Sequence, residues 1–327
     1  MTFGPPPVSG SSIPEQGFLY LVYGDRRFVD EALQSCGSLK RVSPAAHVTV
    51  VVDRLTPELE DELRRVFDDV REGIAPVHGD EFGARRLPWH YGLTFKVRNM
   101  HTASPYQRTF FVDTDTYFLD RVDGLFDLLE YFDLVLTPAP GDTSEVSNPR
   151  GEVMTGFTPY NTGVVVFDRD RTADLFERWE RLQNAAMASD REHAGPTQET
   201  FAAALLESSA RFCVLQTTWN ARLPYPERFA GPIKLVHAHA HELGRLPIRA
   251  AAERLNRTSG IRVWLPGINE PVYPTMGTRR WLLVASKGIA YFLRRDTRRL
   301  ARVAVQRWPA FGARVRKLRE LSRSLRR

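Results

Sequence analysis

Short apolar runs rich in β-branched and aromatic residues alternate along the chain with segments whose apolar residues recur every three or four positions. The first pattern predicts strands and the second predicts amphipathic helices. We expect strands at residues 18–25, 47–53, 109–112, 133–138, 161–167, 212–216 and 233–241. We expect helices at residues 28–42, 56–67, 91–103, 123–132, 173–186 and 197–209. This alternation predicts an α/β fold in which helices flank a mixed, mostly parallel sheet.

Two aspartates, Asp113 and Asp115, directly follow the strand predicted at 109–112 and are separated by one threonine. On a continued strand both carboxylates would point to the same face, where their charges repel. Mg²⁺ or Mn²⁺ between them would relieve the repulsion, because hard divalent cations prefer carboxylate oxygens. A DxD tripeptide also occurs by chance in loops, so the pattern alone leaves a structural role open.

The composition is that of an ordinary globular protein, with 43% hydrophobic and 26% charged residues. Only two cysteines are present, Cys36 and Cys213, which fits a reducing compartment and excludes a disulfide-stabilised scaffold. No GxGxxG follows the first predicted strand and no GxxxxGK[ST] occurs, so the common dinucleotide and P-loop fingerprints are absent.

Several short motifs resemble, in their order, those of one enzyme family. The stretch VDTDTYFLD (112–120) is similar to the DxD motif of nucleotide-sugar glycosyltransferases of the GT-A fold. The resemblance is greatest to family 8, the retaining group that includes glycogenin and bacterial lipooligosaccharide galactosyltransferases. The other matching segments are LTFK (93–96), YNTGVVVF (160–167), PTQETF (196–201), TTWN (217–220) and KLVHAHAH (234–241).

The resemblance implies a Rossmann-like GT-A domain that transfers a sugar from a nucleotide sugar, expected to be a UDP-sugar, to a glycan or lipid-linked acceptor with retention. It implies Mn²⁺ or Mg²⁺ on Asp113, Asp115 and His237. The implied donor-binding residues are Tyr23, Asp53, Lys96, Asp113, Asp115, Asn161 and Gly163. Lys96 would contact the diphosphate, and Tyr23 and Asp53, at the ends of the first two strands, would hold the base and ribose. Gln198 would position the sugar, with Glu199 as the neighbouring acid.

The chain departs from the family pattern at two places. Thr197 replaces the first acid of a DQD-type motif, and the aromatic residue and glycine expected after the metal histidine are missing. Instead His237, His239 and His241 alternate, which on a strand would place all three on one face. Position in the motif favours His237 as the ligand and His239 next; a separate zinc site formed by all three is the alternative.

Two other classes of protein remain open. A sugar nucleotidyltransferase would share the sheet and the metal chemistry, although such enzymes carry a Gly-rich loop after the first strand, and VYGDRRF (22–28) has one glycine. A catalytically inactive GT-A module that binds nucleotide sugars is the second, and Thr197 favours it. The segment 141–157, with Asp142 and Glu145, is expected to be a lid or an acceptor loop.

The C-terminal segment is strongly basic. Residues 279–327 hold 16 Lys and Arg against Asp296 and Glu320, a net charge of +14, whereas residues 1–278 carry −8. Apolar residues recur there at helical spacing, namely Trp308, Phe311, Val315, Leu318, Leu321 and Leu325. This predicts a basic amphipathic helix that binds an anionic membrane surface; a core-packing or dimerising helix is the alternative. Nucleic acid is not expected as a partner, since no reading motif is present.

These patterns predict three parts: a disordered leader at 1–16, a glycosyltransferase domain at 17–278 and the basic helical tail at 279–327. The leader lacks the basic and apolar regions of a signal peptide, and no run of 18 apolar residues occurs. The expected location is cytoplasmic and peripheral, on the inner face of a bacterial cell membrane.

Overall fold

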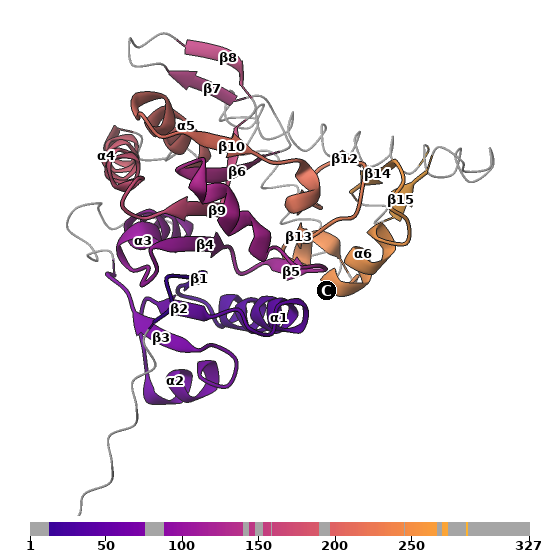
Figure 1. Ribbon diagram of the computed structural model, residues 1–327, viewed down its shortest axis with the longest axis horizontal. Helices are drawn as coiled ribbons and strands as arrows, with labels where there is room; N and C mark the ends of the chain where they lie inside the picture. Colours follow the sequence, from indigo (N-terminus) through magenta and orange to yellow (C-terminus); the bar gives the residue numbers. More distant parts are fainter. Residues whose placement is uncertain are drawn as a thin grey trace, which may run out of the picture.

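A seven-stranded sheet crosses the protein with helices on both faces (Figure 1). The computed structural model describes residues 13–75, 88–139, 144–147, 153–157, 159–189, 197–244, 246–266, 270–273 and 286. The strand order is β10-β6-β9-β4-β1-β2-β3. These strands are β1 (Gln16–Val22), β2 (Val48–Val52), β3 (Asp69–Glu72), β4 (Arg108–Val112), β6 (Leu134–Pro138), β9 (Tyr160–Asp168) and β10 (Phe212–Val214). Within this sheet β9 runs antiparallel to β4 and β6, and the other pairs are parallel.

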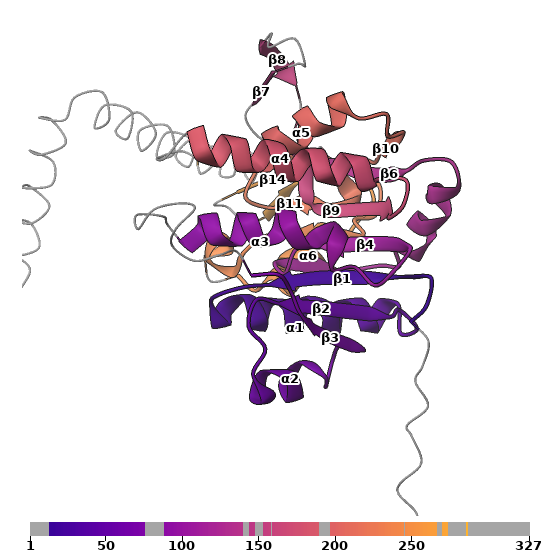
Figure 2. The ribbon, with the colours of Figure 1, turned by 90° about the vertical axis from the view of Figure 1, so that its left-hand side faces the viewer.

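Two apolar layers hold the helices on the sheet. Side chains that alternate along β1, such as Phe18 and Leu19, belong to opposite layers, as the two-residue period of a strand requires. One layer packs under α1 (Arg26–Val42), α2 (Pro57–Leu63) and the 3₁₀ helix Asp123–Glu130. The other packs under α3 (Pro88–Thr102), α4 (Ala173–Ser189) and α5 (Thr197–Glu207). Figure 2 shows α3 and α4 lying along the sheet on this second face. The predicted α/β class with a mostly parallel sheet is confirmed.

A smaller lobe lies beside the main sheet, at the right of Figure 1. It holds a sheet in the order β11-β13-β5 and a second in the order β12-β14-β15. Its elements are β5 (Thr116–Phe118), the 3₁₀ helix Thr217–Trp219, β11 (Ala221–Arg222), β12 (Glu227–Phe229), β13 (Leu235–His237), the 3₁₀ helix Ala240–Leu243, α6 (Ile248–Leu255), β14 (Arg262–Leu265) and β15 (Glu270–Val272). β5 follows β4 after a three-residue turn, so the lobe is tied to the centre of the main sheet at that point.

The structure differs from the sequence-based expectation at several places, since β3, β5 and most elements of the smaller lobe were not predicted. The strand predicted at 233–241 ends at His237, because the Glu242 carboxylate accepts a hydrogen bond from the His239 N–H (2.8 Å) and starts a 3₁₀ helix. The strand predicted at 109–112 does end at Val112, so Asp113 and Asp115 lie in the turn between β4 and β5 and do not share a strand face. The segment 141–157 contains a hairpin of β7 (Ser144–Ser147) and β8 (Val153–Phe157).

The predicted tail at 279–327 and most of the predicted leader, residues 1–12, lie outside the described residues, except for Ser286. Asp142 also lies outside them. None of the helices in the described ranges is long and apolar enough to cross a membrane.

The stability of the fold depends on the layer under β4, the strand that leads to Asp113. Phe110 on β4 is 1% exposed, and its ring centroid stacks 5.0 Å from that of Phe18. We expect Phe110→Ala to lower the free energy of unfolding by about 3 to 5 kcal/mol, because it leaves a cavity among packed aromatic rings. The matched control is Phe212→Ala on the edge strand β10, where the ring is 38% exposed; a loss below about 1 kcal/mol is expected. Equal losses in chemical denaturation would contradict this assignment of the core.

Candidate metal and nucleotide site

The turn between β4 and β5 places two carboxylates beside one histidine. The Asp113 N–H donates to the carbonyl of Gly163 on β9 (2.8 Å), which fixes the start of the turn. At its far end, Thr116 of β5 pairs with His237 of β13, and the Ala238 N–H donates to the Asp115 carbonyl (2.9 Å). Two strand pairings, one in each sheet, therefore bring residues more than a hundred positions apart into contact.

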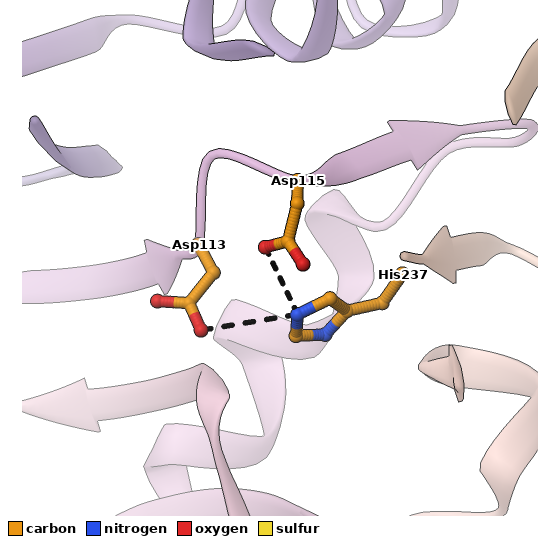
Figure 3. Close-up of side chains that lie close together, drawn as sticks. All are labelled: Asp113, Asp115 and His237. Carbon is orange, nitrogen blue, oxygen red and sulfur yellow. Dashed lines mark ion pairs between the residues drawn. The ribbon is translucent and has the colours of Figure 1, made fainter. Parts of the chain in front are cut away.

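The three side chains form a compact cluster. The His237 Nε2 lies 3.1 Å from Asp115 Oδ1 and 3.8 Å from Asp113 Oδ2. Figure 3 shows the imidazole pointing between the two carboxylates. One ligand atom from each residue lies within 4.8 Å of the others, and no other group of three or more potential ligands is found in the described part of the chain. Carboxylate and imidazole ligands bind first-row ions at about 2.0 to 2.2 Å, so one ion fits between them.

Neighbouring cations offset the charge of the cluster. Burial by itself raises the pKa of Asp115, but the adjoining His237 and the positive charges of His239 and Arg222 hold that pKa well below its usual range. The carboxylate therefore stays ionised although it is only 7% exposed. An ionised, buried oxygen is the form that a divalent cation needs.

A chain of buried amides sets which nitrogen of His237 faces the aspartates. The Gly163 N–H donates to Asn161 Oδ1 (3.0 Å), so that atom is the acceptor. The same oxygen accepts from Asn220 Nδ2 (2.8 Å), which leaves Asn220 Oδ1 to accept from His237 Nδ1 (3.0 Å). With its proton on Nδ1 committed to Asn220, His237 turns Nε2 to the cluster, where this nitrogen would be the ligand to a bound ion. Asn220 was not singled out from the sequence, although the TTWN match contains it.

Gly163 has no side chain where the cluster needs space. A Cβ built there would lie 2.2 Å from Asp113 Oδ2 and 2.5 Å from His237 Cε1. Any larger residue would push apart two of the three candidate ligands. Gly163 thus adjoins two candidate ligands and Asn161 bonds Asn220 behind His237, and their expected donor-binding roles stay predictions.

Lys96 pairs with Asp113. Its Nζ lies 2.7 Å from Asp113 Oδ1, while Asp113 Oδ2 is the oxygen that faces His237. The ammonium also lies 5.0 Å from the centroid of the Phe111 ring, and the residue is 8% exposed. Asp113 therefore contacts Lys96 through Oδ1 and faces His237 through Oδ2.

A pocket of about 490 Å³ opens at the ends of β1 and β2 and is lined by Tyr23, Asp53 and Tyr91, among other residues. Asp53 Oδ2 accepts from the Gly24 N–H (3.1 Å). Burial and the Asp53 carboxylate raise the pKa of Tyr91 to about 12. The pKa of Tyr23 is also raised, by burial and by the charges of Asp113 and Asp115. Because β1, which leads to Tyr23, pairs in parallel with β4, which leads to Asp113, the pocket and the cluster lie at neighbouring strand ends. Tyr91 was not predicted from the sequence.

The other two histidines are placed differently. His239 Nδ1 lies 3.2 Å from both carboxylate oxygens of Glu31 on α1. Burial alone would lower its pKa, but the hydrogen bond to Glu31 and the charges of Asp115 and Glu242 raise it to about 9. His241 is exposed and stacks on His239. Because β13 ends at His237, the three histidines do not share a strand face.

Gln198 and Glu199 lie in the first turn of α5 and are half-buried. The carbonyl of the preceding Thr197 accepts from Trp179 Nε1 (3.1 Å), which anchors this turn on α4. α5 packs against β9, the strand that carries Asn161 and Gly163. The two residues thus belong to an element that borders the site, and their roles stay a prediction.

Comparisons with known proteins give similar structures only. No family model matches the chain, and no curated protein does. The apo structure of the bifunctional glycosyltransferase WbbM has 12% identity and a TM-score of 0.46 over 69% of this chain and 46% of its own. The glycosyltransferase GlyE of Streptococcus pneumoniae TIGR4 has 10% identity and a TM-score of 0.48, over 71% of this chain and 57% of its own. This chain therefore spans only about half the length of either protein.

The galactosyltransferase LgtC, solved in complex with donor and acceptor sugar analogs, has 12% identity and a TM-score of 0.47 over 73% of this chain and 94% of its own. These three similarities concern the arrangement of the backbone. Conclusions about chemistry therefore rest on the side chains of this chain.

The close approach at Gly163 gives a direct test of the cluster. We expect Gly163→Ala to weaken Mn²⁺ binding at least about tenfold, because the added methyl group displaces Asp113 and His237. Isothermal calorimetry with Mn²⁺ measures this, and thermal unfolding shows whether the fold survives. The control is Gly124→Ala, where a Cβ meets nothing within 4 Å. Unchanged Mn²⁺ affinity in a folded Gly163→Ala protein would contradict the geometry of the cluster.

Proposed function

We propose that the protein is a metal-dependent glycosyltransferase that moves a sugar from a nucleotide sugar, a UDP-sugar in the first instance, to a glycan or lipid-linked acceptor. The observation that carries this proposal is the cluster of Asp113, Asp115 and His237 beside the pocket that contains Tyr23 and Asp53. A nucleoside in that pocket would extend its diphosphate to the cluster. This is the order of groups in a nucleotide-sugar donor.

Each side chain of the site has a separate proposed role. Asp113, Asp115 and His237 would hold Mn²⁺, which accepts the mixed oxygen and nitrogen set better than Mg²⁺ does. When bound, the ion supplies positive charge to the leaving diphosphate. Tyr23 offers an aromatic face to the base, and Asp53 offers a carboxylate to the ribose hydroxyls. Lys96 orients Asp113 and adds a positive charge beside the diphosphate.

Gln198 and Glu199 are the proposed sugar-side residues. A glutamine amide can position a sugar without attacking it, which favours front-face attack and retention over a carboxylate nucleophile. Glu199 directly follows Gln198 in the first turn of α5 and is the acidic residue nearest to it in the sequence. Thr197, which stands where the family motif has an acid, is buried.

The two alternatives predict different products. A nucleotidyltransferase would make a nucleotide sugar from a nucleoside triphosphate and a sugar phosphate, and an inactive module would bind the donor without cleaving it. The cluster fits all three classes, so the products formed from donor and acceptor decide among them.

The central test replaces one candidate ligand. We expect Asp113→Asn to weaken Mn²⁺ binding and to reduce UDP release from a panel of UDP-sugars at least about 100-fold, because the cluster loses an ionised ligand. Excess EDTA should have the same effect on the unchanged protein. Asp127→Asn, at an exposed position on the 3₁₀ helix Asp123–Glu130, serves as the control. Full activity of Asp113→Asn in the presence of EDTA would exclude the proposed role of the metal.

The basic tail suggests where the enzyme works. We propose that residues 279–327 bind the protein to an anionic membrane surface on the cytoplasmic side, where a lipid-linked acceptor is available. The support is the net charge of +14 together with apolar residues at helical spacing. Each basic residue near such a surface contributes about 1 kcal/mol.

Liposome co-sedimentation tests the tail. We expect the full chain to bind vesicles that contain phosphatidylserine at least about tenfold more strongly than phosphatidylcholine vesicles, and to lose this preference in high salt. A chain that ends at residue 278 is expected to show no preference. Equal binding by the two chains would overturn the anchor proposal and leave the catalytic proposal intact.

A further inference from the structure

Arg222 lies beside His237 in the β11-β13-β5 sheet. The register pairs Arg222 of β11 with His237 of β13, and paired residues on neighbouring strands point to the same face. Since His237 faces Asp113 and Asp115 (Figure 3), the side chain of Arg222 leaves the sheet on the side of the cluster. Consistent with this, its charge acts on Asp115.

The guanidinium of Arg222 has an unused donor. Its Nε is buried and has no hydrogen-bond partner among the described residues. Its Cζ lies 5.6 Å from the centroid of the Tyr225 ring, and the Tyr225 N–H donates to the Arg222 carbonyl (3.2 Å), which closes a turn. The aromatic ring thus supports the plane of the guanidinium, and the buried donor lacks the partner that such groups ordinarily have.

The other two cations near the cluster are already paired. Lys96 donates to Asp113 (2.7 Å), and His239 lies 3.2 Å from Glu31. No ion pair joins Arg222 to a carboxylate in the described part of the chain. Of these three cations, Arg222 is therefore the one without a paired carboxylate.

The position of Arg222 in the sheet indicates which part of a bound nucleotide sugar it would contact. The nucleoside pocket is lined by Val29 of α1, and α1 packs against β5. β11 is at the opposite edge of the three-stranded sheet from β5, with β13 between them. Arg222 therefore lies on the side of the cluster away from the nucleoside, where the distal phosphate and the sugar of a donor would extend.

We propose that Arg222 binds the distal phosphate of a nucleoside diphosphate held at the cluster, so that it recognises the donor and the leaving group together with Lys96. The planar guanidinium suits two phosphate oxygens at once. This inference rests on the proposed function, because it requires a nucleoside diphosphate at the cluster. An anionic group of the acceptor offers the same chemistry and is the alternative source.

Nucleotides that differ by one phosphate test the proposal. UDP and UMP are titrated by calorimetry in saturating Mn²⁺ against the unchanged protein, Arg222→Met and Arg228→Met. We expect Arg222→Met to weaken UDP binding at least about tenfold and UMP binding less than about twofold, because only UDP carries the distal phosphate. Arg228 is exposed on β12, and its replacement should change neither affinity. Arg222→Lys, which keeps the charge without the planar donors, should show an intermediate loss for UDP.

Three outcomes would overturn the proposal. One is equal UDP affinity in Arg222→Met and the unchanged protein. A second is an equal loss for UDP and UMP, together with weaker Mn²⁺ binding in the absence of nucleotide, which would make Arg222 a structural residue of the cluster. A third is unchanged UDP binding with slower transfer to a phosphorylated acceptor alone, which would assign Arg222 to the acceptor. If the unchanged protein bound neither nucleotide, the proposed function itself would be contradicted. If Arg222→Met failed to fold, the ratio of UDP to UMP affinity in Arg222→Lys would decide.

Discussion

The site depends on the close contact between β9 and the turn that follows β4. Gly163 accepts a hydrogen bond from the Asp113 N–H, donates its own N–H to Asn161, and leaves the space that Asp113 Oδ2 and His237 occupy. A side chain at this position would block the cluster, and a shift of β9 by one residue would turn Asn161 to the other face of the sheet. The antiparallel pairing of β9 with β4, which is unusual in a mostly parallel sheet, is therefore what allows a strand rather than a loop to support the ligands.

From that contact a directional chain of hydrogen bonds runs to the imidazole. It begins at the Gly163 N–H, which can only donate and so makes Asn161 Oδ1 an acceptor. Asn220 donates its Nδ2 to that oxygen, and its own Oδ1 accepts from His237 Nδ1. Asn220 also donates to Thr137 Oγ1 (2.9 Å), so both of its amide hydrogens are used. Because each member is buried and satisfied, reversing any one of them would leave a buried polar atom unpaired. The fold thus makes His237 Nδ1 a hydrogen-bond donor and points Nε2 at the two carboxylates.

The sequence predicted six of the seven strands of the main sheet, its flanking helices and the candidate ligands Asp113, Asp115 and His237, since these depend on local patterns and motif order, but it missed β3 and most strands of the smaller lobe. It did not distinguish the three alternating histidines by their residues, because the end of β13 is set by the contact of Glu242 with the His239 backbone. Arg222 and Tyr91 were also missed. Neither belongs to a recognisable motif, and each lies near the site only through strand register or through the packing of α3 against β1. What the sequence lacked was the pairing of distant strands, which a local pattern does not encode.

The division of Asp113 between two partners determines how charge is balanced at the site. With Lys96 on Oδ1, the two aspartates and the lysine leave a net negative charge, which would repel a diphosphate. A divalent ion held by Asp113, Asp115 and His237 would reverse the sign and make the same site attractive to a diphosphate. Lys96 alone does not reverse the sign, because it balances only one of the two aspartates, and His239 is paired with Glu31. An ion at this cluster would therefore favour nucleotide binding, and a cation without a paired carboxylate would meet the remaining negative charge of a bound diphosphate. In the described part of the second sheet, Arg222 is the side chain placed to provide it.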